Sequence, residues 1–137
     1  MFMDHVAPGK RGQIMAAVRS KDTTPELKIR RALHRLGYRY ALHASDLPGR
    51  PDLVFRPRKK IVFVHGCFWH GHRCKKGRRP KTNRSFWSAK ADNNKARDRR
   101  VTRNLRRGGW SVLTVWQCQT KDMDKLVDKI ARFLESR

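Results

Sequence analysis

The 137-residue sequence predicts a single α/β domain, and three patterns support this. A helix-start signal near residue 24 is followed by apolar residues at helical spacing. Short β-branched and aromatic runs flank a basic turn at residues 56–60, and an amphipathic helix pattern covers residues 122–134. We therefore expect one domain over residues 1–137, with the order helix, hairpin-rich sheet, helix, strand, helix.

A helix is expected to begin within the segment Asp-Thr-Thr-Pro-Glu at residues 22–26. Thr24 is the expected N-cap, Pro25 suits the first helical position, and Glu26 suits the positive end of the helix dipole. Gly37 is the expected C-terminal stop. Helix chemistry alone therefore explains Glu26, and any catalytic role for it competes with that explanation.

The segment before this helix has two expected parts. Residues 1–11 contain Met, Pro, Gly and basic residues, and we expect a flexible N-terminal arm. Residues 12–20 contain a short apolar run typical of a short helix, in which Met15 is either a core residue or an apolar wedge near a ligand.

The sheet is expected to contain a hairpin made by residues 52–55 and 61–64. Residues 38–43 alternate like a further strand, and residues 45–51 form a loop rich in Pro and Gly. Because hairpin strands are antiparallel, the start of one lies beside the end of the other. We therefore expect Asp52 close to Val64 and His65.

The second half of the chain adds two helices and a strand. Residues 89–107 form a very basic helix whose few apolar residues, Ala96, Val101 and Leu105, are expected on the sheet. Residues 110–118 resemble a central strand, and the helix at residues 122–134 carries several of the acids. We expect this last helix to face away from a polyanionic partner.

The charge of the chain indicates that partner. Lys and Arg total 34 against 11 acids, which gives a formal charge of +23 and a pI of about 11.4. Such self-repulsion is offset by a polyanion, and nucleic acid is the expected one. No apolar run is long enough for a membrane span and no signal-peptide pattern is present, so we expect a cytoplasmic protein with no membrane role.

A structural zinc site is expected around residues 67–74. Cys67, His72 and Cys74 lie within eight residues, and Cys118 follows the later strand. Thiolate and imidazole donors at four positions suit tetrahedral Zn²⁺. His70 competes with His72 as the ligand, because the spacing alone does not separate them. The alternative is three thiols beside a His-rich loop that binds phosphate.

A catalytic centre is expected in the middle of the chain, where acidic residues are few. Asp52 can supply a hard oxygen ligand for Mg²⁺, and the Val64 backbone carbonyl can supply another. His65, His70 and Asp98 can handle protons, with the acid orienting an imidazole. Pro51-Asp52 before a second strand matches the layout of the restriction-like PD-(D/E)xK nucleases. The match is incomplete, because Phe63 and His65 stand where that layout has an acid and a lysine.

Exposed aromatic residues between cations suit stacking on bases or wedging between them. Phe68, Trp69 and Trp87 lie in the most basic part of the chain. The alternative is that they cover the zinc loop.

Several segments together resemble the very-short-patch-repair (Vsr) family of T:G mismatch DNA endonucleases. They include Leu-Pro-Gly-Arg-Pro-Asp at residues 47–52, Val-His-Gly-Cys-Phe-Trp-His at residues 64–70 and Ala-Arg-Asp-Arg-Arg at residues 96–100, with further matches at residues 15–26, 109–113 and 116–118. The resemblance covers nearly the whole chain. It implies a restriction-endonuclease-like core, a mixed sheet flanked by helices, with a structural zinc.

The resemblance also implies roles for individual residues. Asp52 and the Val64 carbonyl would hold Mg²⁺, and His70 would be the general base, backed by Glu26. His65 and Asp98 would complete the centre. His72 then becomes the preferred zinc ligand, because His70 is assigned to catalysis. Phe68, Trp69 and Trp87 would form the DNA wedge, with Met15 assisting from the other groove. The family often has threonine at position 64, where this chain has valine.

The expected function is Mg²⁺-dependent nicking 5′ of the thymine in a T:G mismatch, the lesion left when 5-methylcytosine deaminates. The enzyme is expected to act as a monomer on double-stranded DNA. Two alternatives are a nicking endonuclease that reads a sequence in matched DNA and a non-catalytic, zinc-stabilised DNA-binding module. The module does not explain why Asp52 and Asp98 remain in an acid-poor region.

Overall fold

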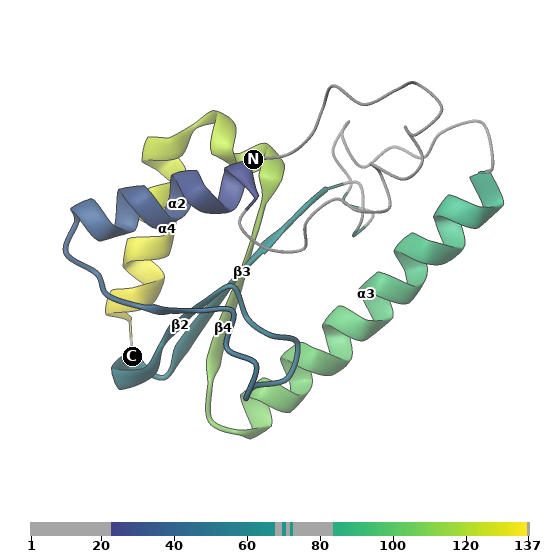
Figure 1. The fold of residues 1–137 in the computed structure, drawn as a ribbon, viewed down its shortest axis with the longest axis horizontal. Helices are drawn as coiled ribbons and strands as arrows, with labels where there is room; N and C mark the ends of the chain where they lie inside the picture. Colours follow the sequence, from purple (N-terminus) through teal and green to yellow (C-terminus); the bar gives the residue numbers. More distant parts are fainter. Residues whose placement is uncertain (1–22, 68–69, 71, 73–83, 137) are drawn as a thin grey trace.

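The described part of the chain forms a mixed four-stranded sheet between two helical layers. The computed structural model describes residues 23–67, 70, 72 and 84–136. Helices α2 and α4 cover one face of the sheet, and α3 packs on the other (Figure 1). The helices and strands are α2 (Thr24–Arg35), β1 (Ala41–Leu42), β2 (Leu53–Phe55), β3 (Lys60–His65), α3 (Arg84–Arg107), β4 (Ser111–Trp116) and α4 (Met123–Glu135). This arrangement confirms the predicted mixed sheet flanked by helices.

Helix α2 begins one residue earlier than its predicted cap implies. The N-cap is Thr23, whose hydroxyl accepts a hydrogen bond from the Glu26 N–H at 3.4 Å, so the prediction of Thr24 is wrong. Gly37 ends the helix as predicted. It adopts a φ of 97°, and the N–H of Tyr38 returns to the Leu33 carbonyl. Both ends of α2 are thus fixed by local hydrogen bonds.

The sheet has the strand order β1-β2-β3-β4, with β1–β2 and β2–β3 antiparallel and β3–β4 parallel. Leu53 faces Val62 across the predicted hairpin. Strand β1 is only two residues long, shorter than the run predicted at residues 38–43. Tyr40 instead packs edge-on against Phe55, and the backbone leaves the extended region at His43. Strand β4 lies at the edge of the described sheet, so the prediction of a central strand there is wrong.

Helix α3 is the longest element of the described chain. It has 24 residues and begins at Arg84, so Trp87 lies in its first turn and not in the loop predicted before residue 89. Leu105 is buried, and Val101 packs beside it against the strand residues of the second core. Gly109, with a φ of 91°, lets the chain reverse into β4. The helix is therefore anchored to the sheet through its C-terminal half.

The first core lies between the sheet, α2 and α4, and its buried members include Ile29, Phe55, Val62 and Ile130. Asp122 caps α4 by accepting from the Lys125 N–H at 3.2 Å. No helix among the described residues is long and apolar enough to cross a membrane. The segment at residues 12–20, which carries Met15, lies outside the described residues.

Candidate active site

The β2–β3 hairpin fixes Asp52 beside the end of β3, as predicted. Asp52 directly precedes β2, and the Val64 N–H donates to its Oδ2 at 2.7 Å. Burial raises the pKa of Asp52 to about 7, while the Val64 N–H opposes that rise and the Glu26 charge adds to it. A buried carboxyl with this pKa gains much from a nearby cation, which favours its ionised form.

Glu26 reaches the same region from the first turn of α2. It is 1% exposed, and its Oε2 accepts from Arg30 Nη1 at 3.2 Å. His43 Nε2 lies 3.1 Å from that same oxygen, while His43 Nδ1 lies 4.0 Å from Asp52 Oδ1. The imidazole therefore stands between two buried carboxyl groups.

Sequence reasoning missed His43. Its position depends on a φ of 47° after β1, a backbone conformation that L residues rarely adopt, and on the packing of α2 against the hairpin. The one available signal is that histidine is among the residues that tolerate this conformation more often. That signal is too weak to select one of six histidines.

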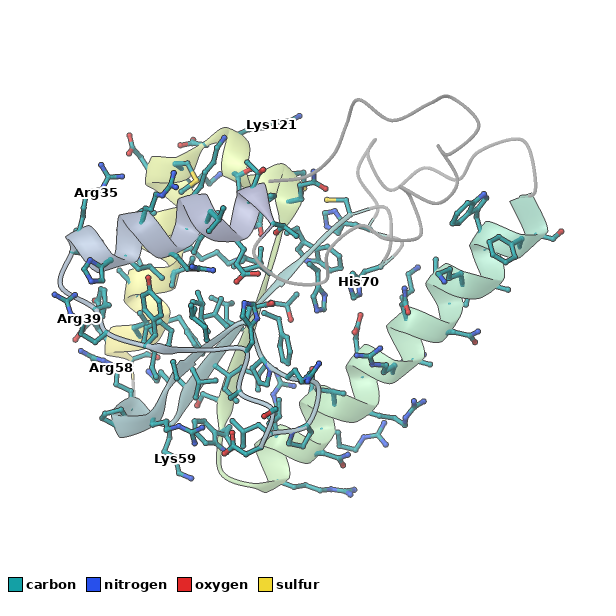
Figure 2. All side chains as sticks on the ribbon, in the orientation of Figure 1. Arg35, Arg39, Arg58, Lys59, His70 and Lys121 are labelled. Carbon is teal, nitrogen blue, oxygen red and sulfur yellow. The ribbon has the colours of Figure 1, made fainter. Side chains whose placement is uncertain are left out.

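A second cluster consists of His65, His70 and Asp98. The two imidazole rings stack with centroids 3.8 Å apart and planes within 4°. His70 Nδ1 lies 2.6 Å from Asp98 Oδ2, and His65 Nδ1 lies 3.8 Å from that oxygen. Figure 2 shows His70 between the end of the sheet and α3. The structure thus brings the three residues together from β3, the segment after it and α3.

Burial sets the charge of His65. Burial lowers the pKa of this imidazole most, the neighbouring His70 adds to the fall and Asp98 opposes it, and together they bring the pKa to about 4. His65 is therefore neutral near pH 7. Its Nδ1 is buried without a hydrogen-bond partner among the described residues. A buried polar atom of this kind is uncommon and marks a place where water or a ligand group is needed.

One cavity of about 380 Å³ connects the two clusters. Asp52, Val64, His65, His70 and Asp98 all line it, together with His43 and the α3 side chains Asn94 and Arg97. Five of the predicted active-site residues therefore face a common space, and Glu26 lies behind Asp52 and His43. Asp92, also on α3, does not line this cavity.

A larger cavity of about 970 Å³ lies between α3 and β4 and shares His65, His70 and Asp98 with the first. Its other lining is strongly cationic, with Lys95, Arg99, Arg103, Arg106 and Arg107 on α3. Cations spaced along one helix can contact successive phosphates of a nucleic acid strand. The larger cavity therefore joins the His65, His70 and Asp98 cluster to a basic surface.

Cys67, His72 and Cys118 form a third cluster. Their donor atoms lie within 4.8 Å of one another, and Cys118 Sγ is 3.5 Å from His72 Nδ1. Cys67 is fully buried, and the Cys118 N–H points at its sulfur at 3.4 Å. Thiolate and imidazole donors in this arrangement can hold a soft divalent ion. The predicted fourth ligand, Cys74, lies outside the described residues.

The aromatic residues are described only in part. Trp87 is half-buried in the first turn of α3 and contacts Phe86 edge-on, with centroids 5.0 Å apart. Phe86 is 59% exposed. Phe68, Trp69 and Met15 lie outside the described residues.

Comparisons with known proteins agree with this geometry. A family model described as DNA mismatch endonuclease Vsr matches residues 3–76. The chain is 46% identical over 132 residues to the type II nicking enzyme V.XorIIP of Xanthomonas oryzae pv. oryzae, covering 96% of this chain and 97% of that protein. It is 40% identical to the type II nicking enzyme V.NmeAIP of Neisseria meningitidis serogroup A, over 87% of this chain and 85% of the relative.

A further relative is the DNA mismatch endonuclease Vsr of Escherichia coli, 38% identical over 119 residues, which are 87% of this chain and 76% of the relative. The fold, the cavity and these relatives together define a DNA endonuclease. The chain belongs to the DNA mismatch endonuclease Vsr family. The non-catalytic module considered from the sequence does not agree with that membership.

Proposed function

We propose that this endonuclease nicks DNA 5′ of the thymine in T:G mismatches, in the presence of Mg²⁺, to begin very short patch repair. The observation that carries the proposal is the shared cavity, which brings the carboxyl group of Asp52 together with the His70–Asp98 pair. Phosphodiester hydrolysis needs charge stabilisation and a base to activate water, and the two clusters provide one of these each.

Asp52 and the Val64 backbone carbonyl are the proposed Mg²⁺ ligands. The fit rests on chemistry, because Asp52 is a buried carboxyl group whose pKa is raised to about 7 by burial and whose ionised form needs a cation. Bound Mg²⁺ supplies charge stabilisation at the phosphate. Since the proposed Val64 ligand is a backbone oxygen, valine at this position serves as well as threonine.

His70 is the proposed general base. Its Nδ1 lies 2.6 Å from Asp98 Oδ2, so we assign the ring hydrogen to this nitrogen, which donates a hydrogen bond to the carboxylate. The Nε2 lone pair is then available to take a proton from water. His65 stacks on the His70 ring and, being neutral, adds no charge that would weaken the base. Glu26 lies beside His43, on the side of the centre that contains the proposed Mg²⁺ ligand Asp52.

Zn²⁺ is the proposed occupant of the Cys67, His72 and Cys118 cluster, with Cys74 as the fourth ligand. The fit rests on three soft donors whose atoms lie within 4.8 Å of one another at the end of β4. Bound Zn²⁺ would join the segment after β3 to the segment after β4. Its proposed role is structural, and it holds the segment that carries His70.

The proposed mismatch wedge consists of Phe68, Trp69 and Trp87, with Met15 entering from the other groove. Trp87 and Asp98 lie eleven residues apart on α3, which places them about 16 Å apart along the helix. One rigid helix therefore relates an aromatic contact to the cutting site. We propose that a monomer carries out the reaction, because all proposed catalytic residues come from one chain.

A second proposal is nicking of a specific sequence in matched DNA. It is supported by the names of two relatives, both called type II nicking enzymes. This alternative uses the same centre and differs only in what the aromatic and basic residues recognise.

A gel assay separates the two proposals. Duplexes labelled on either strand carry one central T:G pair or its fully paired counterpart, in several flanking sequences, with Mg²⁺ or with EDTA. We expect a nick in the T strand only, at the mismatch, and only with Mg²⁺. Equal cutting of matched duplexes would favour the sequence-specific enzyme, and nicking in EDTA would contradict the Mg²⁺ centre.

A further inference from the structure

His43 lines the cavity beside Asp52, and the proposed mechanism gives it no function. It follows the two-residue strand β1 and adopts a φ of 47°. Its N–H donates to the Asp52 carbonyl at 3.3 Å, which ties its backbone to the residue that opens the hairpin. A non-glycine residue in the left-handed region costs about 1–2 kcal/mol, and such residues concentrate at functional sites.

The unusual backbone directs the imidazole of His43 between two buried carboxyl groups. Its Nε2 is 3.1 Å from Glu26 Oε2, and its Nδ1 is 4.0 Å from Asp52 Oδ1. Donor atoms of the three residues all lie within 4.8 Å of one another. Ligands of a six-coordinate ion with bonds of about 2.1 Å lie about 3 Å apart when adjacent and about 4.2 Å apart when opposite. With one ligand atom from each side chain the set lies within 4.8 Å, so small side-chain movements can bring all three groups to one ion.

We propose that Glu26, His43 and Asp52 form a mixed nitrogen–oxygen centre for a divalent transition-metal ion, with the His43 imidazole as a direct ligand. The centre shares Asp52 with the proposed Mg²⁺ site, so the inference rests on that carboxylate being a metal ligand. It adds two side chains to the metal site and a preference among metals.

The chemistry of the three donors sets that preference. Carboxylate and carbonyl oxygens suit Mg²⁺ and Mn²⁺ alike, whereas an imidazole nitrogen favours transition-metal ions. Two buried carboxylates also attract a divalent ion, although the Arg30 guanidinium on Glu26 Oε2 offsets part of their charge. His43 therefore makes this centre bind Mn²⁺ more tightly than Mg²⁺.

Pulsed electron paramagnetic resonance of the full chain with bound Mn²⁺ tests the inference without DNA. The wild type is expected to show coupling of Mn²⁺ to an imidazole nitrogen. His43→Asn is expected to lose it, since asparagine tolerates the left-handed backbone but has no ring nitrogen. Competition titrations should show Mn²⁺ binding at least about tenfold more tightly than Mg²⁺ in the wild type, and that ratio should fall in His43→Asn.

Two matched variants locate the nitrogen. His34→Gln changes an exposed histidine on α2, and His70→Gln changes a second histidine of the cavity, which His65 also lines. Both should keep the coupling. A coupling that survives in His43→Asn, a coupling that disappears in His70→Gln, or no bound Mn²⁺ in the wild type would each overturn the proposal. Circular dichroism shows whether each variant is folded, and His43→Gln replaces His43→Asn if that variant is not.

The outcome is distinguishable from that of the proposed function. Mismatch nicking is measured with Mg²⁺ and DNA, whereas nitrogen coupling is measured with Mn²⁺ alone. An enzyme that cuts matched DNA would still show the coupling, and an enzyme that nicks T:G mismatches without the coupling would disprove only the His43 ligand.

Discussion

Lys60 and Asp52 are both buried ionisable side chains, and they lie at opposite ends of the same hairpin. Lys60 Nζ donates to the Phe133 carbonyl at 2.5 Å, the Leu134 carbonyl at 3.3 Å and the Ser136 hydroxyl at 2.9 Å, and it also contacts the Ser136 carbonyl. These oxygens belong to the C-terminal end of α4, where the helix dipole favours a cation. Asp52, in contrast, accepts from the Val64 N–H and lies beside a second carboxylate.

This comparison distinguishes Lys60, whose charge stabilises the fold, from Asp52, whose charge serves the function. At the Lys60 end, every partner comes from the fold itself, so the site is complete. At the Asp52 end, the fold brings together two acids, His43 and His65, and the buried Nδ1 of His65 has no hydrogen-bond partner among the described residues. Groups left in this state are stabilised by something that the fold does not provide, such as a metal ion, water or a phosphate.

Asp52→Asn gives the largest expected effect. Loss of the proposed metal ligand removes several kcal/mol of transition-state stabilisation, which corresponds to a fall in nicking rate of about a thousandfold. Single-turnover nicking of a T:G duplex in Mg²⁺ measures it, with DNA binding determined in parallel. Binding should stay within a few-fold of the wild type, and full nicking activity in this variant would disprove the role of Asp52.

His70→Ala is expected to lower the single-turnover rate by about 10²–10⁴-fold, the usual contribution of a general base. His34→Ala, which changes an exposed histidine on the other side of the sheet, should leave it unchanged. Asp98→Asn should lower the rate less than His70→Ala does, because it removes only the group that orients the imidazole. A reversed order of these two effects would assign the base to a different residue.

The pH dependence of stability should differ between wild type and Asp52→Asn. The folded pKa of Asp52 is raised from 3.8 to about 7, so the contribution of its protonated form is present below pH 4 and is lost as pH rises through 7. His65 acts in the opposite direction. Its folded pKa is lowered from 6.5 to about 4, so its contribution is present above pH 6.5 and is lost as pH falls through 4.

Denaturant unfolding without metal, at several values of pH from 4 to 8, isolates the Asp52 contribution as the difference between wild type and Asp52→Asn. The wild type should lose up to about 4 kcal/mol relative to the variant as pH rises across this range. Mg²⁺ at pH 7.5 should then stabilise the wild type but not Asp52→Asn. Parallel stability profiles for the two proteins would show that Asp52 is not buried as described.

Lys60→Met tests the Lys60 end of the hairpin, where every hydrogen-bond partner comes from the fold itself. Loss of hydrogen bonds from a buried cation should lower the free energy of unfolding by about 2 kcal/mol, while the nicking rate of the folded protein stays unchanged. Lys129→Met changes an exposed lysine on α4 and serves as the control, with an expected change below about 0.5 kcal/mol. A catalytic defect in folded Lys60→Met would remove the contrast between the two ends.

Arg103→Gln gives the smallest expected effect. This side chain lines the larger cavity on α3, so its loss should weaken DNA binding at any sequence and reduce the slope of log affinity against log salt by about 1. Arg35→Gln, on α2 at the opposite face of the sheet (Figure 2), should leave the slope unchanged. Equal slopes for both variants would place the DNA elsewhere.

The sequence predicts the part of the site that depends on local patterns. The hairpin pattern placed Asp52 beside Val64, and a hydrogen bond of 2.7 Å confirms it. His43 could not be predicted, because its position depends on a left-handed residue and on the approach of α2 to the hairpin, neither of which has a period or a motif. The edge position of β4 was missed for a similar reason, since apolar alternation reports burial and not strand order.

Iron-directed cleavage tests most directly the claim that the Asp52 end of the hairpin is the metal-dependent centre. Fe²⁺ replaces Mg²⁺ on the enzyme bound to a T:G duplex, and ascorbate with peroxide then produces radicals that cut the nearest polypeptide and DNA backbones. We predict cuts in the chain near residues 52 and 64 and in the DNA beside the mismatched thymine, all absent in Asp52→Asn. Cuts confined to other segments, or unchanged in Asp52→Asn, would contradict the account.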